Sequence, residues 1–193
     1  MSGAAGAPVL VHLMRHGRPT NPGRLLGHTD DAATAEGIAA CVAQAADLSP
    51  TGVISSDLHR AERCAAAIAA AQGATATVDV RWRELDFGAW DGCDPRSLDA
   101  AALGRFWADP DGSPPPGGER WSALKVRVGA ALADLSDRTL VVSHAGAMRA
   151  ALAQACDLSA RQAWAFDLPY AALVTLRLWR GELPAAQIVR LRP

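Results

Sequence analysis

Short, continuous apolar runs interrupt the chain at intervals. They are too brief for helices and show no alternation of polar and apolar residues, which is typical of strands buried on both faces of a sheet. The pattern predicts strands at Val9 to Met14, Gly52 to Ser55, Thr77 to Val80 and Thr139 to Ser143.

Segments with helical periodicity lie between these runs. Their apolar residues recur every three or four positions, which indicates a helix with one buried face. The predicted helices are Glu36 to Asp47, Asp57 to Gln72, Trp121 to Leu135 and Gly146 to Cys156, with a further helix start after Ser159.

Strands that alternate with helices indicate an α/β fold with a mostly parallel sheet. The C-terminal pattern differs, because Tyr170 to Trp179 and Gln187 to Leu191 flank the turn-like Arg180-Gly181-Glu182. We therefore expect a three-layer α/β/α sandwich with an antiparallel edge hairpin. An unpaired edge strand of this kind could support a homodimer.

The composition indicates one domain over residues 1–193. The only low-complexity stretch, Asp109 to Gly118, is too short to link domains and predicts a loop. A net charge of −1 argues against nucleic acid or an anionic membrane as a partner. Neither a leader-like pattern in Met1 to Pro8 nor a long apolar run is present, so we expect a soluble, cytoplasmic protein.

A polar cluster follows each predicted strand. Ligands bind at the carboxyl ends of strands in open α/β sheets, so the four clusters predict a single site. The clusters are Arg15-His16-Gly17, Ser56-Asp57-Leu58-His59-Arg60, Arg83-Glu84-Leu85 and Ser143-His144-Ala145-Gly146.

These residue types fit a phosphate group. Arg15 and Arg60 would offer planar forks that match phosphate oxygens. His144 and the backbone of Ala145 stand where a strand leads into a helix, whose N-terminus favours anions. No phosphate-binding glycine loop of the nucleotide type and no carboxylate cluster for magnesium is found in the sequence.

His16 and Glu84 could perform the chemistry. Two nearby guanidinium groups would lower the histidine pKa from about 6.5, which keeps the imidazole neutral and nucleophilic toward phosphorus. Glu84 lies among apolar residues that favour its protonated form, so it could protonate the leaving alkoxide and later activate water. Asp86, two residues further on, is its rival.

Together these motifs resemble the histidine phosphatase, or phosphoglycerate mutase-like, superfamily. The resemblance also rests on the run from Glu84 to Gly92 and on Val141-Val142-Ser143-His144-Ala145-Gly146. It implies His16 as the phosphorylated nucleophile and Glu84, not Asp86, as the proton donor. It also implies a phosphate pocket of Arg15, Arg60 and His144, a small phosphomonoester as substrate, and no metal or organic cofactor.

Within this superfamily, the compact chain favours a phosphatase over a mutase. The loop from Gly23 to Asp30 and the segment Gly117-Gly118-Glu119 look most like the α-ribazole phosphatases of cobalamin biosynthesis. α-Ribazole 5′-phosphate is therefore a candidate substrate. A phosphoglycerate mutase and a non-catalytic phosphate-binding module remain the alternatives.

The loop after the first strand departs from the family pattern. Arg18, Pro19 and Pro22 stand where the family often has Glu, Thr and Asn. We expect Gly17 to let the backbone turn close to the substrate, and Thr20 or Asn21 to bind phosphate. Arg18 and Arg24 would add positive charge at the mouth of the site, which could favour a second anionic group.

Other polar and aromatic residues have structural interpretations. We expect His12 to be hydrogen-bonded in the core and Asp57 to stabilise a helix start. His28 and His59 are expected to be partly exposed. Trp107, Trp121 and Trp164 are expected to fill the core, whereas Trp90 could wall the pocket.

Overall fold

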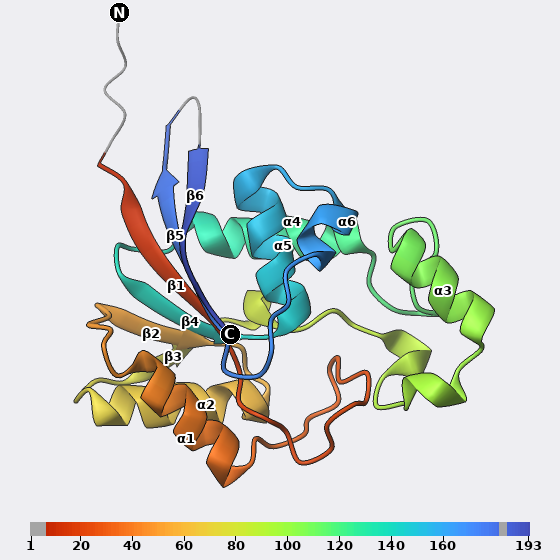
Figure 1. The fold of residues 1–193 in the computed structure, drawn as a ribbon, viewed down its shortest axis with the longest axis horizontal. Coiled ribbons are helices and arrows are strands. Elements are labelled where there is room, and N and C mark those ends of the chain that lie inside the picture. Colours follow the sequence, from red (N-terminus) through yellow and green to blue (C-terminus); the bar gives the residue numbers. More distant parts are fainter. Residues whose placement is uncertain (1–6, 182–184) are drawn as a thin grey trace, which may run out of the picture.

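The computed structural model describes residues 7–181 and 185–193, and its centre is a six-stranded sheet (Figure 1). The strand order is β3-β2-β4-β1-β5-β6, with β1 to β4 parallel and β5 and β6 antiparallel. The predicted fold class and edge hairpin are confirmed. The strands are β1 (Val9–Arg15), β2 (Gly52–Ser55), β3 (Ala76–Val78), β4 (Thr139–Ser143), β5 (Leu173–Trp179) and β6 (Ala185–Arg192).

Helices cover both faces of the sheet. Side chains of α1 and α2 pack in one apolar cluster and those of α4 and α5 in another, and Figure 1 shows the two pairs on opposite sides of the strands. The α-helices are α1 (Ala35–Ala45), α2 (His59–Ala71), α3 (Ala100–Ala108), α4 (Trp121–Ala133), α5 (Ala145–Cys156) and α6 (Ala160–Trp164).

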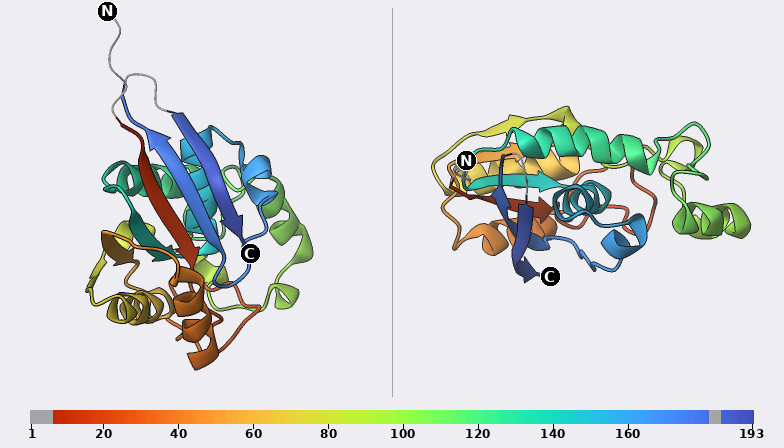
Figure 2. Two further views of the ribbon diagram at one scale, coloured as in Figure 1. Left: turned by 60° about the vertical axis from the view of Figure 1, so that its left-hand side comes forward. Right: turned by 90° about the horizontal axis from the view of Figure 1, so that it is seen from above.

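Helix α3 was not predicted. It is rich in alanine, and its apolar face is short, with Phe106 buried and Ala102 and Leu103 only partly buried against the same apolar cluster. The helix begins after Asp99, whose side chain accepts a hydrogen bond from the Ala102 N–H at 2.7 Å. Figure 2 shows that α3 projects well beyond the sheet.

The alternation of side chains along β1 explains the two apolar clusters. Val11 and Leu13 pack with α4 and α5, whereas Met14 packs with α1 and α2, and all three are fully buried. His12 lies between Val11 and Leu13 in the sequence, and its Nδ1 is 3.0 Å from Thr175 Oγ1. The prediction of a hydrogen-bonded core histidine is therefore confirmed.

The crossovers place a crevice between β1 and β4. These strands are parallel neighbours, with Arg15 opposite Ser143, but α1 follows β1 on one face and α5 follows β4 on the other. Such a switch point is where open α/β sheets bind ligands. The next residues along the two strands are His16 and His144, which therefore lie side by side.

Three structural predictions need correction. Strand β3 ends at Val78, and Val80 begins a short 3-10 helix because the Asp79 side chain accepts a hydrogen bond from Arg81 N at 2.9 Å. Asp57 does not cap α2, which begins at His59, but pairs with Arg83. Trp107 is 45% exposed and does not fill the core.

The other predicted tryptophan positions differ among themselves. Trp121 is buried as predicted, and Trp164 is partly buried. Trp90 is buried against Phe106, with ring centroids 5.9 Å apart, and belongs to the core.

Some sequence predictions fall outside the described residues. These are the segment from Met1 to Gly6 and Glu182 of the hairpin turn. Among the residues that the structure does describe, no helix has the length and apolar character needed to cross a membrane.

The contact between Gly17 and Gly37 gives a testable prediction. A Cβ atom on Gly17 would lie 2.2 Å from the Gly37 carbonyl oxygen, so Gly17→Ala must displace backbone. We expect the free energy of unfolding to fall by about 1–3 kcal/mol in urea titrations.

Gly104→Ala is the matched control. Gly104 lies inside α3, and a Cβ atom added there would meet no neighbouring group within 4 Å, so this change should stabilise the chain by up to about 1 kcal/mol. Equal effects of the two substitutions would contradict the close approach.

Candidate active site

A pocket opens at the carboxyl ends of β1 and β4. Its polar part contains the side chains of Arg15, His16 and Glu84 and the first turn of α5, at Ala145 and Gly146. The remaining lining is mostly leucine and aromatic side chains. Residues from three of the four predicted clusters thus line the pocket. The fourth cluster, Ser56 to Arg60, lies behind this lining.

His16 is buried in an orientation that leaves one ring nitrogen without a hydrogen-bond partner among the described residues. Its Nδ1 lies 2.7 Å from the Gly17 carbonyl oxygen, which can only accept a hydrogen bond. In the neutral ring, Nδ1 therefore carries the proton and Nε2 holds a lone pair. The side chain is also close to His144, with ring centroids 5.1 Å apart.

The surroundings of His16 keep its imidazole neutral. Burial is the main cause that holds the His16 pKa well below its usual value, and the charges of Arg60 and Arg15 lower it further. The hydrogen bond to Gly17 opposes this shift. The lowered pKa of His16 agrees with the sequence prediction. Burial, however, lowers this pKa more than the two guanidinium charges do.

His144 is fully buried behind His16. Its Nε2 lies 2.7 Å from Ser56 Oγ, whereas its Nδ1 has no hydrogen-bond partner among the described residues. Burial, followed by the charge of Arg60, also lowers the His144 pKa well below the usual histidine value.

Glu84 reaches the pocket because Gly146 leaves room for it. Glu84 Oε2 accepts a hydrogen bond from Gly146 N at 2.9 Å, and Oε1 accepts one from Leu85 N at 2.8 Å. A Cβ on residue 146 would lie 2.1 Å from Oε1. Asp86 instead accepts a hydrogen bond from Gly88 N and does not line the pocket.

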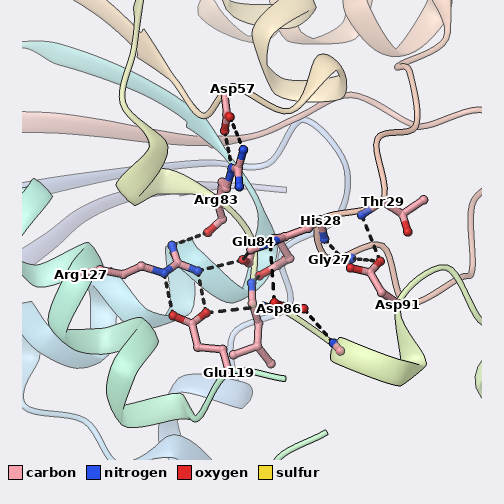
Figure 3. Close-up of polar contacts among 12 residues, drawn as sticks. Gly27, His28, Thr29, Asp57, Arg83, Glu84, Asp86, Asp91, Glu119 and Arg127 are labelled. Atoms are coloured by element: carbon pink, nitrogen blue, oxygen red, sulfur yellow. Dashed lines mark hydrogen bonds and ion pairs between the residues drawn. The ribbon is translucent and has the colours of Figure 1, made fainter. Parts of the chain in front are cut away.

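A partly buried ion pair holds the backbone of the Glu84 segment (Figure 3). Arg127 Nη2 donates to the Glu84 carbonyl and Nη1 to the Arg83 carbonyl, both at 2.8 Å. Glu119 orients the guanidinium through two hydrogen bonds of 2.7 Å. His28 Nε2 lies 3.2 Å from the same Glu84 oxygen.

Arg60 is fully buried, and backbone carbonyls occupy most of its fork. Its Nη atoms donate to Leu26, Gly27 and Thr29 oxygens at 2.6–2.9 Å. Asp91 holds the same loop by accepting from backbone N–H groups at residues 27–29, as Figure 3 shows. We predicted that the whole Arg60 guanidinium would be available to phosphate. Only its Nε has no partner among the described residues.

Arg15 is held in a similar way. Its Nη1 donates to the Leu168 carbonyl at 2.6 Å, and its guanidinium lies 4.0 Å from the centre of the Tyr170 ring. Its Nε has no partner among the described residues.

The arginines around His16 form no close ion pair with any described residue, although the charge of Glu84 acts on all three. In the part of the chain that the structure describes, neither Arg15, Arg60 nor Arg149 has a carboxylate oxygen within 4.0 Å. Burial lowers the pKa of all three groups. Because buried cations are normally paired, the arrangement favours binding of an anion.

The other predicted ligands divide into two groups. Arg24 and Ala145 line the pocket, although Arg24 Nη1 donates to the Gly92 carbonyl at 2.8 Å. Thr20 and Asn21 do not line it, because both bond to the Asp31 side chain.

Two further residues near the first loop also lie outside the pocket lining. Arg18 is exposed and borders a different hollow. Gly17 lies behind His16, against Gly37.

The sequence interpretation missed Arg149 and Tyr170, which both line the pocket. Arg149 follows Ala145 by one helical turn on α5, so its position on the same face was open to prediction. Tyr170 lies in a loop before β5, where no periodicity identifies it. No group of three or more His, Cys, Asp or Glu side chains within the described ranges could hold a metal ion.

A family model described as "Histidine phosphatase superfamily (branch 1)" matches residues 11–190. The chain belongs to the histidine phosphatase superfamily. This confirms the resemblance inferred from the sequence motifs, and members of this superfamily are phosphatases or mutases.

Similar proteins in the superfamily include one named as a mutase and one named as a phosphatase. The chain is 37% identical over 147 residues to "Probable phosphoglycerate mutase GpmB" of Salmonella choleraesuis, covering 69% of this chain and 68% of that protein. Mycobacterial glucosyl-3-phosphoglycerate phosphatase superposes with a TM-score of 0.83 and 25% identity over 94% of this chain and 97% of the other.

A third relative is similar at the level of the fold. The α-ribazole phosphatase from Shigella flexneri has a TM-score of 0.79 and 23% identity, covering 93% of this chain and 95% of that one.

The depressed histidine pKa values predict acid sensitivity. Below about pH 6.5, the unfolded chain binds protons that His16 and His144 do not take up in the folded chain. The free energy of unfolding should therefore fall from pH 7.5 to 5.5, by up to about 1.4 kcal/mol per pH unit for each histidine.

Urea titrations at several pH values test this slope. His16→Asn should make it shallower, because it removes one of the two buried histidines. A wild-type slope in the His16 variant would contradict the assignment.

Proposed function

We propose that this histidine phosphatase superfamily member is a phosphomonoesterase that forms a phosphohistidine intermediate and needs no metal or organic cofactor. The observation that carries the proposal is the buried, neutral His16, whose Nε2 is free of protein partners in the described structure. Glu84 shares its pocket, as do Arg15 and Arg149, which form no close ion pair with any described residue.

The substrate's phosphoryl group would bind against His16. Nitrogen atoms of Arg15, Arg60 and His144 have no acceptor among the described residues, and a phosphoryl group would provide three oxygens. The N-terminus of α5 would add a favourable dipole. The bound phosphoryl group would thus pair with the arginine charges, with no carboxylate from the protein needed.

The reaction would then proceed in two displacements. His16 Nε2 forms a bond to phosphorus while the P–O ester bond breaks, and protonated Glu84 gives its proton to the departing alcohol oxygen. Glu84, now a carboxylate, takes a proton from water as that water attacks the phosphohistidine. The N–P bond breaks, phosphate leaves, and both residues return to their initial states.

The character of the pocket favours hydrolysis over mutase chemistry. A mutase must retain a small anionic intermediate and return the phosphoryl group to it, yet ten of the seventeen residues that line the pocket are leucine or aromatic, although Arg24 and Arg149 also line it. α-Ribazole 5′-phosphate remains a candidate substrate from the sequence motifs. Cytoplasmic location and dimerisation through the β6 edge also remain predictions.

Removal of the nucleophile should abolish turnover. With p-nitrophenyl phosphate and a chelator present, we expect His16→Ala to lower kcat by more than about 10³-fold. The exposed His59 lies outside the pocket, so His59→Ala is the matched control and should retain wild-type activity. Full activity of the His16 variant, or a wild type inactive on every phosphomonoester, would contradict the proposal.

The proton donor can be tested through the leaving group. An alkoxide needs a proton far more than p-nitrophenolate does, so Glu84→Gln should slow the first turnover of an alkyl phosphate by about 10²–10⁴-fold. The burst of p-nitrophenolate should be slowed much less.

Asp86→Asn is the control, because it keeps the acceptor for Gly88 N. Equal losses on both substrates in Glu84→Gln, or the same selective loss in Asp86→Asn, would contradict the role of Glu84.

A further inference from the structure

Aromatic side chains are concentrated at the pocket. The chain has ten Phe, Tyr and Trp residues, and six of them line this one pocket. The six are Phe87, Phe106, Trp107, Trp121, Trp164 and Tyr170.

Three helices build a continuous aromatic wall. Phe106 and Trp107 come from α3, Trp121 from α4, and Trp164 from α6. Ring centroids lie 4.6 Å apart for Phe106 and Trp107, 4.7 Å for Trp121 and Trp164, and 6.1 Å for Trp107 and Trp164. Rings from separate elements thus meet at distances typical of aromatic packing.

The wall is not merely a core that reaches the surface. Trp107 remains 45% exposed while lining the pocket, and Leu25 and Leu26 line it as well. Large apolar side chains that stay exposed in a concave site commonly mark a binding surface.

Two buried donors in this region have no acceptor among the described residues. They are Trp121 Nε1 and Arg149 Nε. Arg149 is held by the Phe166 carbonyl through Nη2, at 2.9 Å, and its guanidinium lies 5.9 Å from the centre of the Trp164 ring.

We propose that the aromatic wall is a subsite for a planar ring on the alcohol portion of the substrate, so that the enzyme prefers phosphomonoesters of ring-bearing alcohols. The inference rests on the proposed phosphatase function. It names a different substrate class from a second anionic group, for which Arg24 and Arg149 are the cations that line the pocket besides Arg15.

The test compares three primary alkyl phosphates with equivalent leaving oxygens: 3-phenylpropyl phosphate, propyl phosphate and 3-phosphooxypropanoate. Leaving-group reactivity then differs little, so kcat/KM reports recognition of the distant group. Stacking of a flat ring on an aromatic side chain strengthens binding by about tenfold or more. We therefore expect the phenyl compound to exceed the propyl compound by about tenfold or more.

Trp107→Ala should bring this ratio close to one by lowering kcat/KM for the phenyl compound much more than for propyl phosphate, and Trp107→Phe should give an intermediate ratio. The matched control is Trp179→Ala, a partly exposed tryptophan on β5 outside the pocket, which should keep the wild-type ratio.

The outcomes separate this inference from the proposed function. Equal kcat/KM for the phenyl and propyl compounds, or a preference for the carboxylate, would overturn the subsite while leaving the phosphatase intact. Hydrolysis of none of the three, nor of p-nitrophenyl phosphate, would instead overturn the phosphatase function on which the subsite depends.

Discussion

The positive charge around His16 is the constraint on which the site depends. Arg60 is fully buried and Arg15 is partly buried, yet backbone carbonyls and an aromatic ring hold them in place of carboxylates within the described structure. Neutral acceptors fix the two guanidinium groups without cancelling their charge. The charge therefore remains available to an anionic ligand, and together with burial it keeps His16 neutral.

The fold satisfies this constraint through its crossovers. Opposite connections after β1 and β4 place two histidines in one crevice, and the loop that Asp91 holds supplies carbonyls to Arg60. On the other side, Arg127 and Glu119 fix the backbone that carries Glu84 (Figure 3). Each reactive side chain is thus positioned by groups that do not themselves enter the pocket.

The sequence predicted what depends on local pattern. Apolar runs marked the strands, and motifs at their ends identified His16, Glu84 and His144 as neighbours. Arg149 could have been predicted from its spacing after Ala145 on α5. Contacts between distant segments were not predictable in this way: the aromatic wall forms only when α3, α4 and α6 pack together. Thr20 and Asn21 lie elsewhere because Asp31, within the same loop, offers a nearer partner than the pocket does.

The most direct test of the account is to locate the phosphoryl group on the enzyme. Protein labelled with ¹⁵N-histidine can be trapped during turnover and examined by NMR for coupling between phosphorus and nitrogen. The geometry predicts one phosphorylated ring, that of His16, modified at Nε2 because Nδ1 donates to Gly17. A phosphoryl group on Nδ1, on another residue, or on no residue during active turnover would contradict it.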